Sequence, residues 1–194
     1  MLEGEPDAPV FVVRQGALRV YRTSLDGREQ TLIRLGPGAA LNAPAAFFGP
    51  SAADDRLPPG QPAQENAPAS AAALTAVELA VISRADFCRT VIQTPELALV
   101  VLRDLATKVH HLTDLSRDLG LLTVRARLAS FLLSHGSGGG QARWTHNEIA
   151  SQIGTVREVV SRTMRAFVKD GLIKLERHRI VVLDCEALEI EAGT

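Results

Sequence analysis

Residues 144–169 constrain the fold most, because they carry two helix-start signals with a glycine between them. Thr145 and Glu148 have the spacing of a capping box, which opens a short first helix. Gly154 is placed for a tight turn. Residues 155–158 (Thr-Val-Arg-Glu) repeat the capping-box pattern and predict a second, longer helix to the end of the segment. Two capped helices joined across a glycine are typical of a helix-turn-helix motif.

A β-hairpin is expected directly after the second helix. Residues 172–175 and 180–183 are rich in Leu, Ile and Val, and the polar residues between them predict a turn. Behind a helix-turn-helix, such a hairpin would be a wing. Residues 143–179 also carry eight basic and four acidic side chains, although the whole chain has a net charge of −1. A segment with this excess of positive charge suits the phosphate backbone of DNA.

Four polar side chains share one solvent-facing arc at the start of the second helix: Arg157, Glu158, Ser161 and Arg162. In a helix-turn-helix, residues at this place meet base edges in the major groove. Arginine can pair with guanine through two hydrogen bonds, and glutamate can accept one from cytosine. Two other roles remain open. Glu158 could be the capping-box carboxylate, and Arg162 could be its ion-pair partner one helical turn away.

A long helix is predicted over residues 95–119, and a shorter helix over residues 124–135 follows it. Six residues of the long helix are three and four positions apart: Leu102, Leu105, Val109, Leu112, Ser116 and Leu119. Gly120 is expected to end the helix. This heptad seam, flanked by charged residues, favours a helix that pairs with a second copy of itself. The alternative is a single amphipathic helix packed against its own domain.

The first third of the chain reads as short strands with glycine-containing turns, which predicts a barrel or a sandwich. The strand-like runs are residues 10–13, 17–22, 29–35 and 74–82. Residues 49–73 contain eight Ala and five Pro, and we expect a flexible loop there. Ser83 and Asp86 have the spacing of a helix N-cap, so a helix should begin after the last strand.

Composition and motifs exclude several other classes of protein. The two cysteines, Cys88 and Cys185, cannot form a disulfide framework or a four-cysteine metal site in one chain, and they suit the cytoplasm. No apolar run approaches the ~18 residues of a transmembrane helix, so no membrane partner is expected. We find no nucleophile–base pair, phosphate loop or metal-ligand spacing. The sequence therefore predicts no catalytic residue, no metal site and no enzymatic activity.

From residue 4 to residue 190, the chain resembles the CRP/FNR family of bacterial transcription regulators. The most specific match extends from Thr145 to Arg162, and residues 171–173 and 180–183 continue it. The resemblance implies an α+β fold with an N-terminal antiparallel β-roll of jelly-roll type, a long central dimerisation helix and a C-terminal winged helix-turn-helix.

The resemblance divides the chain into a sensor domain over residues 1–94, the dimerisation helix over residues 95–120 and the winged helix-turn-helix over residues 121–194. Members of the family usually carry further residues before the point where this chain begins. We therefore expect the sensor domain to lack an opening helix and a strand or two.

The resemblance also implies a cytoplasmic homodimer that binds double-stranded DNA and regulates transcription, with RNA polymerase as a further partner. The expected site is a palindrome with half-sites similar to TGTGA, and Arg157, Glu158 and Arg162 would read its bases. The residues expected at the DNA backbone are Thr145, Thr155, Ser161, Arg165, Arg177 and Arg179. Val156 stands where the family has Ser or Thr, so the exact start of the reading helix stays open.

The sensor domain departs from the cyclic-nucleotide pattern of the family. Residues 39–44 replace the Gly-Glu pair that would hold the ribose, and residues 67–70 lack the arginine that would hold the phosphate. Arg56 has no neighbouring Ser or Thr. An anionic phosphate is hard to bind without an arginine or a cradle of amides, so we do not expect cyclic AMP to bind. No cofactor is predicted, and the sequence does not identify an effector. The alternative function is a cyclic-nucleotide or other small-ligand receptor in which an effector controls DNA affinity.

Overall fold

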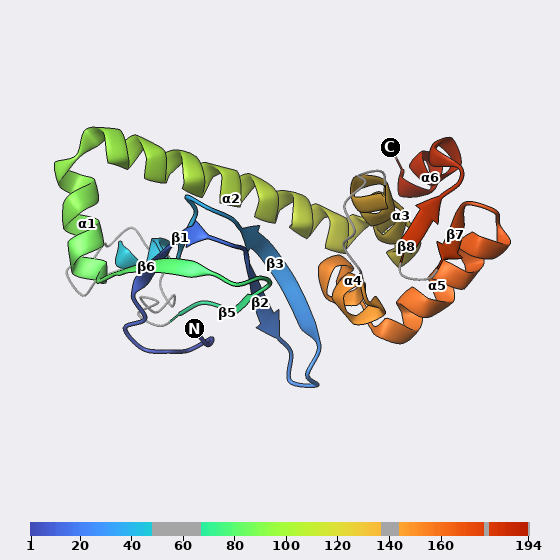
Figure 1. The fold of residues 1–194 in the computed structure, drawn as a ribbon, viewed down its shortest axis with the longest axis horizontal. Coiled ribbons are helices and arrows are strands. Elements are labelled where there is room, and N and C mark those ends of the chain that lie inside the picture. The colour runs from blue at the N-terminus through green and yellow to red at the C-terminus, as the bar shows by residue number, and fades with distance from the viewer. Residues whose placement is uncertain (48–66, 137–143, 177–178, 194) are drawn as a thin grey trace. The chain divides into compact units, whose positions relative to one another are not determined.

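The computed structural model describes residues 1–47, 67–136, 144–176 and 179–193 (Figure 1). The chain divides into two compact units: residues 1–22 with 31–112, and residues 23–30 with 113–194. Within the described ranges, no helix is both long and apolar enough to cross a lipid bilayer.

The first unit is built around two three-stranded sheets, which is the predicted β-roll architecture. One sheet has the order β4-β1-β6, with strands Ala40–Leu41, Val10–Gln15 and Glu78–Ile82. The other has the order β3-β2-β5, with strands Glu29–Leu35, Leu18–Thr23 and Ser70–Ala73. Strand β1 pairs antiparallel with β4 and β6, and β2 pairs antiparallel with β5.

Side chains from both sheets share one apolar cluster. Its buried members include Val13 of β1, Leu18 and Val20 of β2, Leu35 of β3 and Leu41 of β4. Alternate residues of β2 are therefore buried, as the period of two in the sequence predicts. Burial of one face of each sheet is the main stabilising contribution to a β-sandwich of this kind.

Two strand predictions need correction. Residues 70–73 fall in the segment expected to be a loop, yet they form strand β5, because pairing with β2 overrides the low strand propensity of alanine. The strand expected over residues 74–82 begins only at Glu78. The residues before it wrap around the turn at Gly16, where a Cβ would lie 2.2 Å from the carbonyl oxygen of Ala76. The remaining residues of the expected loop, up to residue 66, lie outside the described part.

Two helices follow the strands, and the second of them continues into the second unit. Helix α1 (Arg84–Gln93) begins as predicted, with the Ser83 hydroxyl accepting a hydrogen bond from the backbone N–H of Asp86. Helix α2 (Pro95–Leu121) follows the predicted long helix. It continues through Gly120, which does not take the left-handed conformation that ends many helices, so the helix ends two residues later than the predicted range of 95–119.

The second unit contains the C-terminal helices and a hairpin. In chain order these are α3 (Val124–Gly136), α4 (His146–Ile153), α5 (Arg157–Lys169), β7 (Ile173–Glu176), β8 (Arg179–Val182) and α6 (Cys185–Ala192). Their shared core includes Leu128 of α3, Ile149 of α4, Phe167 of α5 and Leu188 of α6. The hairpin confirms the predicted wing, whereas α6 was not predicted. It is short, and Asp184 caps it by accepting from the N–H of Ala187.

Candidate nucleic-acid interface

The first helix of the motif, α4, opens with the predicted capping box. Thr145 Oγ1 accepts from the backbone N–H of Glu148 at 3.2 Å, and Glu148 Oε2 accepts from the backbone N–H of Thr145 at 2.7 Å. The Thr145 hydroxyl also donates to Glu148 Oε2 at 2.8 Å. On the inner side of α4, Ile149, Ala150 and Ile153 are buried in the core of the unit. The box fixes the start of α4, and the buried face fixes its rotation.

The turn between α4 and α5 depends on Gly154. This residue is left-handed, with φ +67°, a conformation that glycine adopts at little cost. A Cβ at this position would lie 2.4 Å from Leu119 Cδ2, so the close packing also requires glycine. The prediction that Gly154 makes the turn of the helix-turn-helix is confirmed.

The second capping box is not formed. The N-cap of α5 is Val156, which has no side-chain acceptor, and α5 begins at Arg157. Thr155 lies one position too early to cap, and its backbone N–H closes the preceding turn by donating to the carbonyl of Ala150. No side chain caps the first N–H groups of α5. These groups and the helix dipole can therefore face an anion such as a phosphate.

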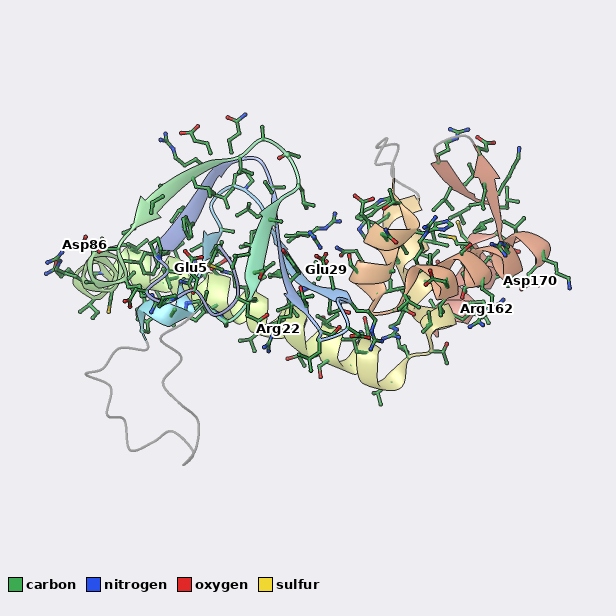
Figure 2. The ribbon with its side chains drawn as sticks, turned by 90° about the horizontal axis from the view of Figure 1, so that it is seen from below. Glu5, Arg22, Glu29, Asp86, Arg162 and Asp170 are labelled. Atoms are coloured by element: carbon green, nitrogen blue, oxygen red, sulfur yellow. The ribbon has the colours of Figure 1, made fainter. Side chains whose placement is uncertain are left out.

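Helix α5 has one buried face and one charged face. Val160, Met164 and Phe167 are fully buried, which fixes the rotation of the helix against the core. Arg157, Glu158, Arg162 and Arg165 are exposed. Figure 2 shows Arg162 on this helix, and Asp170 follows at its end. Of the arc predicted from the spacing, the three charged side chains are exposed and Ser161 is half-buried.

The three predicted base-reading side chains are unpaired. Within the part of the chain that the structure describes, Arg157, Glu158 and Arg162 make no hydrogen bond or ion pair through their side chains. Glu158 is thus not the carboxylate of a capping box, and it does not pair with Arg162. Neither alternative role found in the sequence is formed. Nearby, Arg165 donates to the hydroxyl of Ser161 at 3.1 Å, which joins two of the residues predicted at the DNA backbone.

The wing carries a compact group of charges. Glu176 and Arg179 are opposite each other where β7 and β8 pair. Glu176 Oε2 accepts from Arg179 Nε at 2.7 Å, and Glu176 Oε1 lies 3.2 Å from Lys174 Nζ. The hydrogen bond from Arg179, and then that from Lys174, lower the pKa of Glu176 below its ordinary value. Arg177, also predicted at the DNA backbone, lies outside the described residues.

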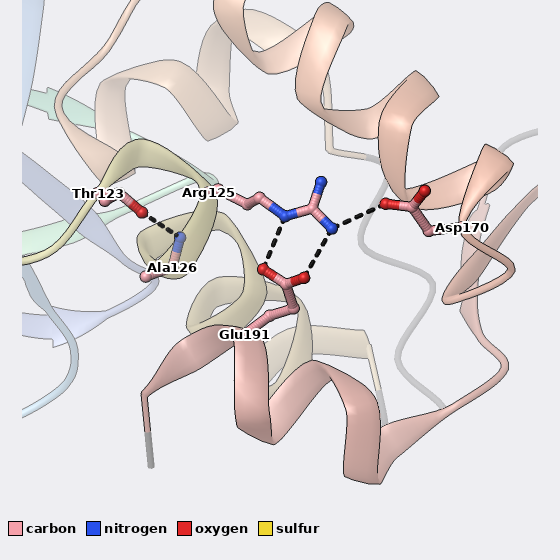
Figure 3. A network of polar contacts seen from close by, with 5 residues as sticks. All are labelled: Thr123, Arg125, Ala126, Asp170 and Glu191. Carbon is pink, nitrogen blue, oxygen red and sulfur yellow. Dashed lines mark hydrogen bonds and ion pairs between the residues drawn. The ribbon is translucent and has the colours of Figure 1, made fainter.

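A network around Arg125 holds the end of α5 in place (Figure 3). Arg125, in the first turn of α3, donates to both carboxylate oxygens of Glu191 at 2.7 Å and to Asp170 Oδ2 at 2.8 Å. Its guanidinium also lies 4.7 Å from the ring centre of Phe167. Arg125 lowers the pKa of Glu191, and the two carboxylates raise the pKa of Arg125. This network ties α3 and α6 to the end of α5, and the sequence analysis missed it.

Most of the predicted seam on α2 is exposed. Among its members, Leu102 is 60% exposed, Val109 is 64% exposed, and Leu112 and Leu119 are also exposed. Ser116 is exposed as well. Leu105 differs, because it is half-buried and packs against the core that α1 and α2 form with the β-roll. One edge of the helix therefore packs on the first unit, as the alternative interpretation expects, and an adjoining apolar stripe is exposed. Pairing of this stripe with a second copy stays a prediction.

The stretch that departs from the cyclic-nucleotide pattern lies around β4. Asn42 is buried and left-handed, with φ +63°, and its Nδ2 donates to the carbonyl of Ala8 at 2.6 Å. Residues 39–46 include no charged side chain. Lys108 of α2 reaches this stretch, but its ammonium donates to the carbonyl of Ala40 at 2.6 Å and to Asp104 at 2.5 Å. Residues 39–46 themselves therefore present no charged side chain to an anionic ligand.

A helix-turn-helix with a wing, in one chain with a β-roll, defines a DNA-binding transcription regulator with a sensor-type domain. Two family models match this chain: the Crp-like helix-turn-helix domain over residues 126–190 and the cyclic nucleotide-binding domain over residues 1–57. The chain belongs to the CRP/FNR family of transcription regulators.

Relatives and solved structures agree with this membership. The cyclic AMP receptor protein of Thermus thermophilus is 30% identical over 190 residues, which cover 96% of this chain and 81% of that protein. A CRP-like cAMP-activated global transcriptional regulator of Mycobacterium tuberculosis is 29% identical and is covered to 80%. A crp/fnr-family regulator from Eubacterium rectale superposes with a TM-score of 0.74 at 27% identity, covering 97% of this chain and 82% of that chain.

Proposed function

We propose that this protein is a homodimeric regulator that recognises a palindrome with TGTGA-like half-sites through α5. The observation that carries the proposal is the division of α5 into two faces. Val160, Met164 and Phe167 on its apolar face are fully buried. Arg157, Glu158 and Arg162 are exposed and, among the described residues, unpaired. When such side chains enter the major groove, no contact within the protein has to break. Binding therefore carries no free-energy cost from lost internal contacts.

Three exposed residues of α5 would read bases in this proposal. Arg157 and Arg162 pair with guanine O6 and N7, and Glu158 accepts from cytosine N4. The residues at the DNA backbone are Thr145, Thr155, Ser161, Arg165, Arg177 and Arg179. Thr145 must exchange its bond with Glu148 for a phosphate. The uncapped N-terminus of α5 supports a phosphate contact near Thr155.

The outward stripe of α2 supports the dimer. Leu102, Val109, Leu112 and Leu119 are exposed at heptad spacing, and pairing with a second copy would bury them. A palindromic site follows, because a two-fold symmetric dimer reads two symmetric half-sites. RNA polymerase is the expected further partner of a regulator that acts at promoters.

We further propose that cyclic AMP is not the effector. The relatives named above are a cyclic AMP receptor and a cAMP-activated regulator, but residues 39–46 of this chain offer no charged side chain to a cyclic nucleotide. Another small ligand of the β-roll remains the alternative effector. Calorimetric titration with cyclic AMP should show no heat of binding, and saturable micromolar binding would refute this part of the proposal.

The test of the function is selection of bound sites from random duplex DNA, with and without cell extract. We expect the enriched sites to be palindromes whose half-sites resemble TGTGA. Enrichment only in the presence of extract would indicate that a small molecule is required. Enrichment of unrelated or non-symmetric sequences would contradict the proposed readout.

A further inference from the structure

The wing has a carboxylate, that of Glu176, between two cations that would bind DNA, Lys174 and Arg179. Glu176 and Lys174 are two residues apart on β7, so their side chains share one face of the strand. Arg179 is the cross-strand neighbour of Glu176. The three charges are therefore brought together by the backbone register of the hairpin. They do not meet merely because long surface side chains happen to touch.

Both oxygens of the Glu176 carboxylate are engaged. Oε2 accepts from Arg179 Nε at 2.7 Å and also lies 2.7 Å from Arg179 Nη2. Oε1 lies 3.2 Å from Lys174 Nζ. A carboxylate in this position binds the guanidinium much as a DNA phosphate would, because both present oxygens to the same N–H groups.

The wing thus differs from the reading helix. Arg157 and Arg162 have no such partner among the described residues, whereas Arg179 and Lys174 are already bound to Glu176. A phosphate that takes either cation must replace this carboxylate. Each wing cation then releases fewer counterions from the DNA. It adds less to the DNA affinity than a cation without a carboxylate partner would.

We propose that Glu176 is an affinity-setting residue of the DNA site: it competes with DNA phosphates for Arg179 and Lys174. This inference rests on the proposed function, because it requires the wing to lie on DNA. Competition of this kind acts on backbone contacts alone, so it lowers the affinity for every duplex by a similar factor. The base preference of α5 stays unchanged.

The experiment measures DNA affinity of the full chain by fluorescence anisotropy at several salt concentrations. The probes are a duplex with the selected palindrome and a duplex of scrambled sequence. Glu176→Gln should tighten binding to both duplexes by about two- to fivefold, the range expected for an exposed ion pair. The dependence on salt should become steeper, because more phosphates are neutralised.

Two further variants separate competition from a general change in charge. Glu186→Gln, at the exposed start of α6, makes the same change in net charge and should leave affinity nearly unchanged. In an Arg179→Ala background, Glu176→Gln should lose most of its effect. If Glu176→Gln tightens DNA binding as much with Arg179→Ala as without it, the proposed competition is overturned. The same holds if Glu186→Gln tightens binding as much as Glu176→Gln does.

The outcomes also distinguish this inference from the proposed function. Weaker binding by Glu176→Gln would mean that the carboxylate positions Arg179 for DNA, and unchanged binding would mean that the wing does not contact DNA. Either result overturns the inference while the palindrome preference stands. A wild-type chain that binds no duplex would overturn both.

Discussion

Individual charged residues on α5 and on the wing differ in what they are free to bind. Arg157 and Arg162 are exposed and unpaired in the described part of the chain, so they can approach base edges without breaking a contact. Arg179 is exposed but already bound to Glu176. The proposed roles, base reading for Arg157 and backbone binding for Arg179, therefore predict different responses to substitution by alanine.

Replacing Arg157 should weaken and relax sequence recognition. Arg157→Ala is expected to lower affinity for the preferred palindrome by ~1–3 kcal/mol, because a bidentate contact with guanine is lost. Selectivity should fall at one guanine of each half-site. Titration of palindromes with single base changes measures both effects, and Arg89→Ala on α1 is the control. Unchanged affinity for the palindrome would remove Arg157 from the readout.

Replacing Arg179 should affect all sequences alike. Arg179→Ala is expected to weaken binding to specific and scrambled duplexes by a similar factor, since phosphates carry no sequence information. The slope of log affinity against log salt should decrease by up to about 0.9, the value for one phosphate contact. A change in base preference with intact nonspecific affinity would reassign Arg179 to direct readout.

At the level of elements, the position of α5 depends on the contacts of its two ends. Its start follows the left-handed Gly154, and Asp170 at its end bonds to Arg125. Arg125 also binds Glu191 of α6. The C-terminal helix α6, although distant from the start of α5 in sequence, therefore helps to hold the end of α5 in place.

Removing the charge of Glu191 should loosen this arrangement. Glu191→Gln is expected to destabilise the protein by about 1–2 kcal/mol, because two charge-assisted hydrogen bonds to Arg125 become weaker. The fold lowers the pKa of Glu191 from 4.5. The carboxylate therefore makes its full contribution to the free energy of unfolding above pH 4.5. The contribution is lost as the pH falls through the lowered pKa.

Urea unfolding at several pH values checks this prediction. The difference between the wild type and Glu191→Gln should be largest near neutral pH and should shrink in acid. Glu186→Gln, on the same helix but outside the network, should cost only a few tenths of a kcal/mol. An equal difference at all pH values would show that the ionised carboxylate does not stabilise the unit.

For the whole molecule, the exposed stripe of α2 predicts self-association. Val109→Glu should shift the chain toward the monomer, because a dimer would bring two carboxylates together in an apolar seam. Thr107→Glu is the control, since Thr107 is exposed on the same helix outside the seam. Analytical ultracentrifugation measures both. A Val109→Glu chain that remains dimeric would place the dimer contact elsewhere.

The parts of the molecule that the sequence predicts are those that local patterns determine. The Thr145 capping box, the Gly154 turn and the polar face of α5 each depend on residues a few positions apart, and all are present. The second capping box failed by one position, because Val156 occupies the N-cap. A shift of one residue is enough to remove such a bond, so capping patterns locate a helix better than they define its first residue.

The parts that the sequence does not predict depend on distant contacts. Arg125 lies 45 residues from Asp170 and 66 residues from Glu191, and no local pattern links them. Strand β5 forms from four small residues because β2 offers a partner. The wing pair of Glu176 and Arg179 required the register of the hairpin. These contacts hold the end of α5 in place and pair the charges of the wing.

We propose that two copies of this chain read one palindrome through α5. Native mass spectrometry of the chain with a duplex of two TGTGA-type half-sites tests it most directly, with a duplex of one half-site for comparison. We predict two chains on the palindrome and markedly weaker occupancy of the single half-site. One chain per duplex, or equal binding to both duplexes, would contradict the account.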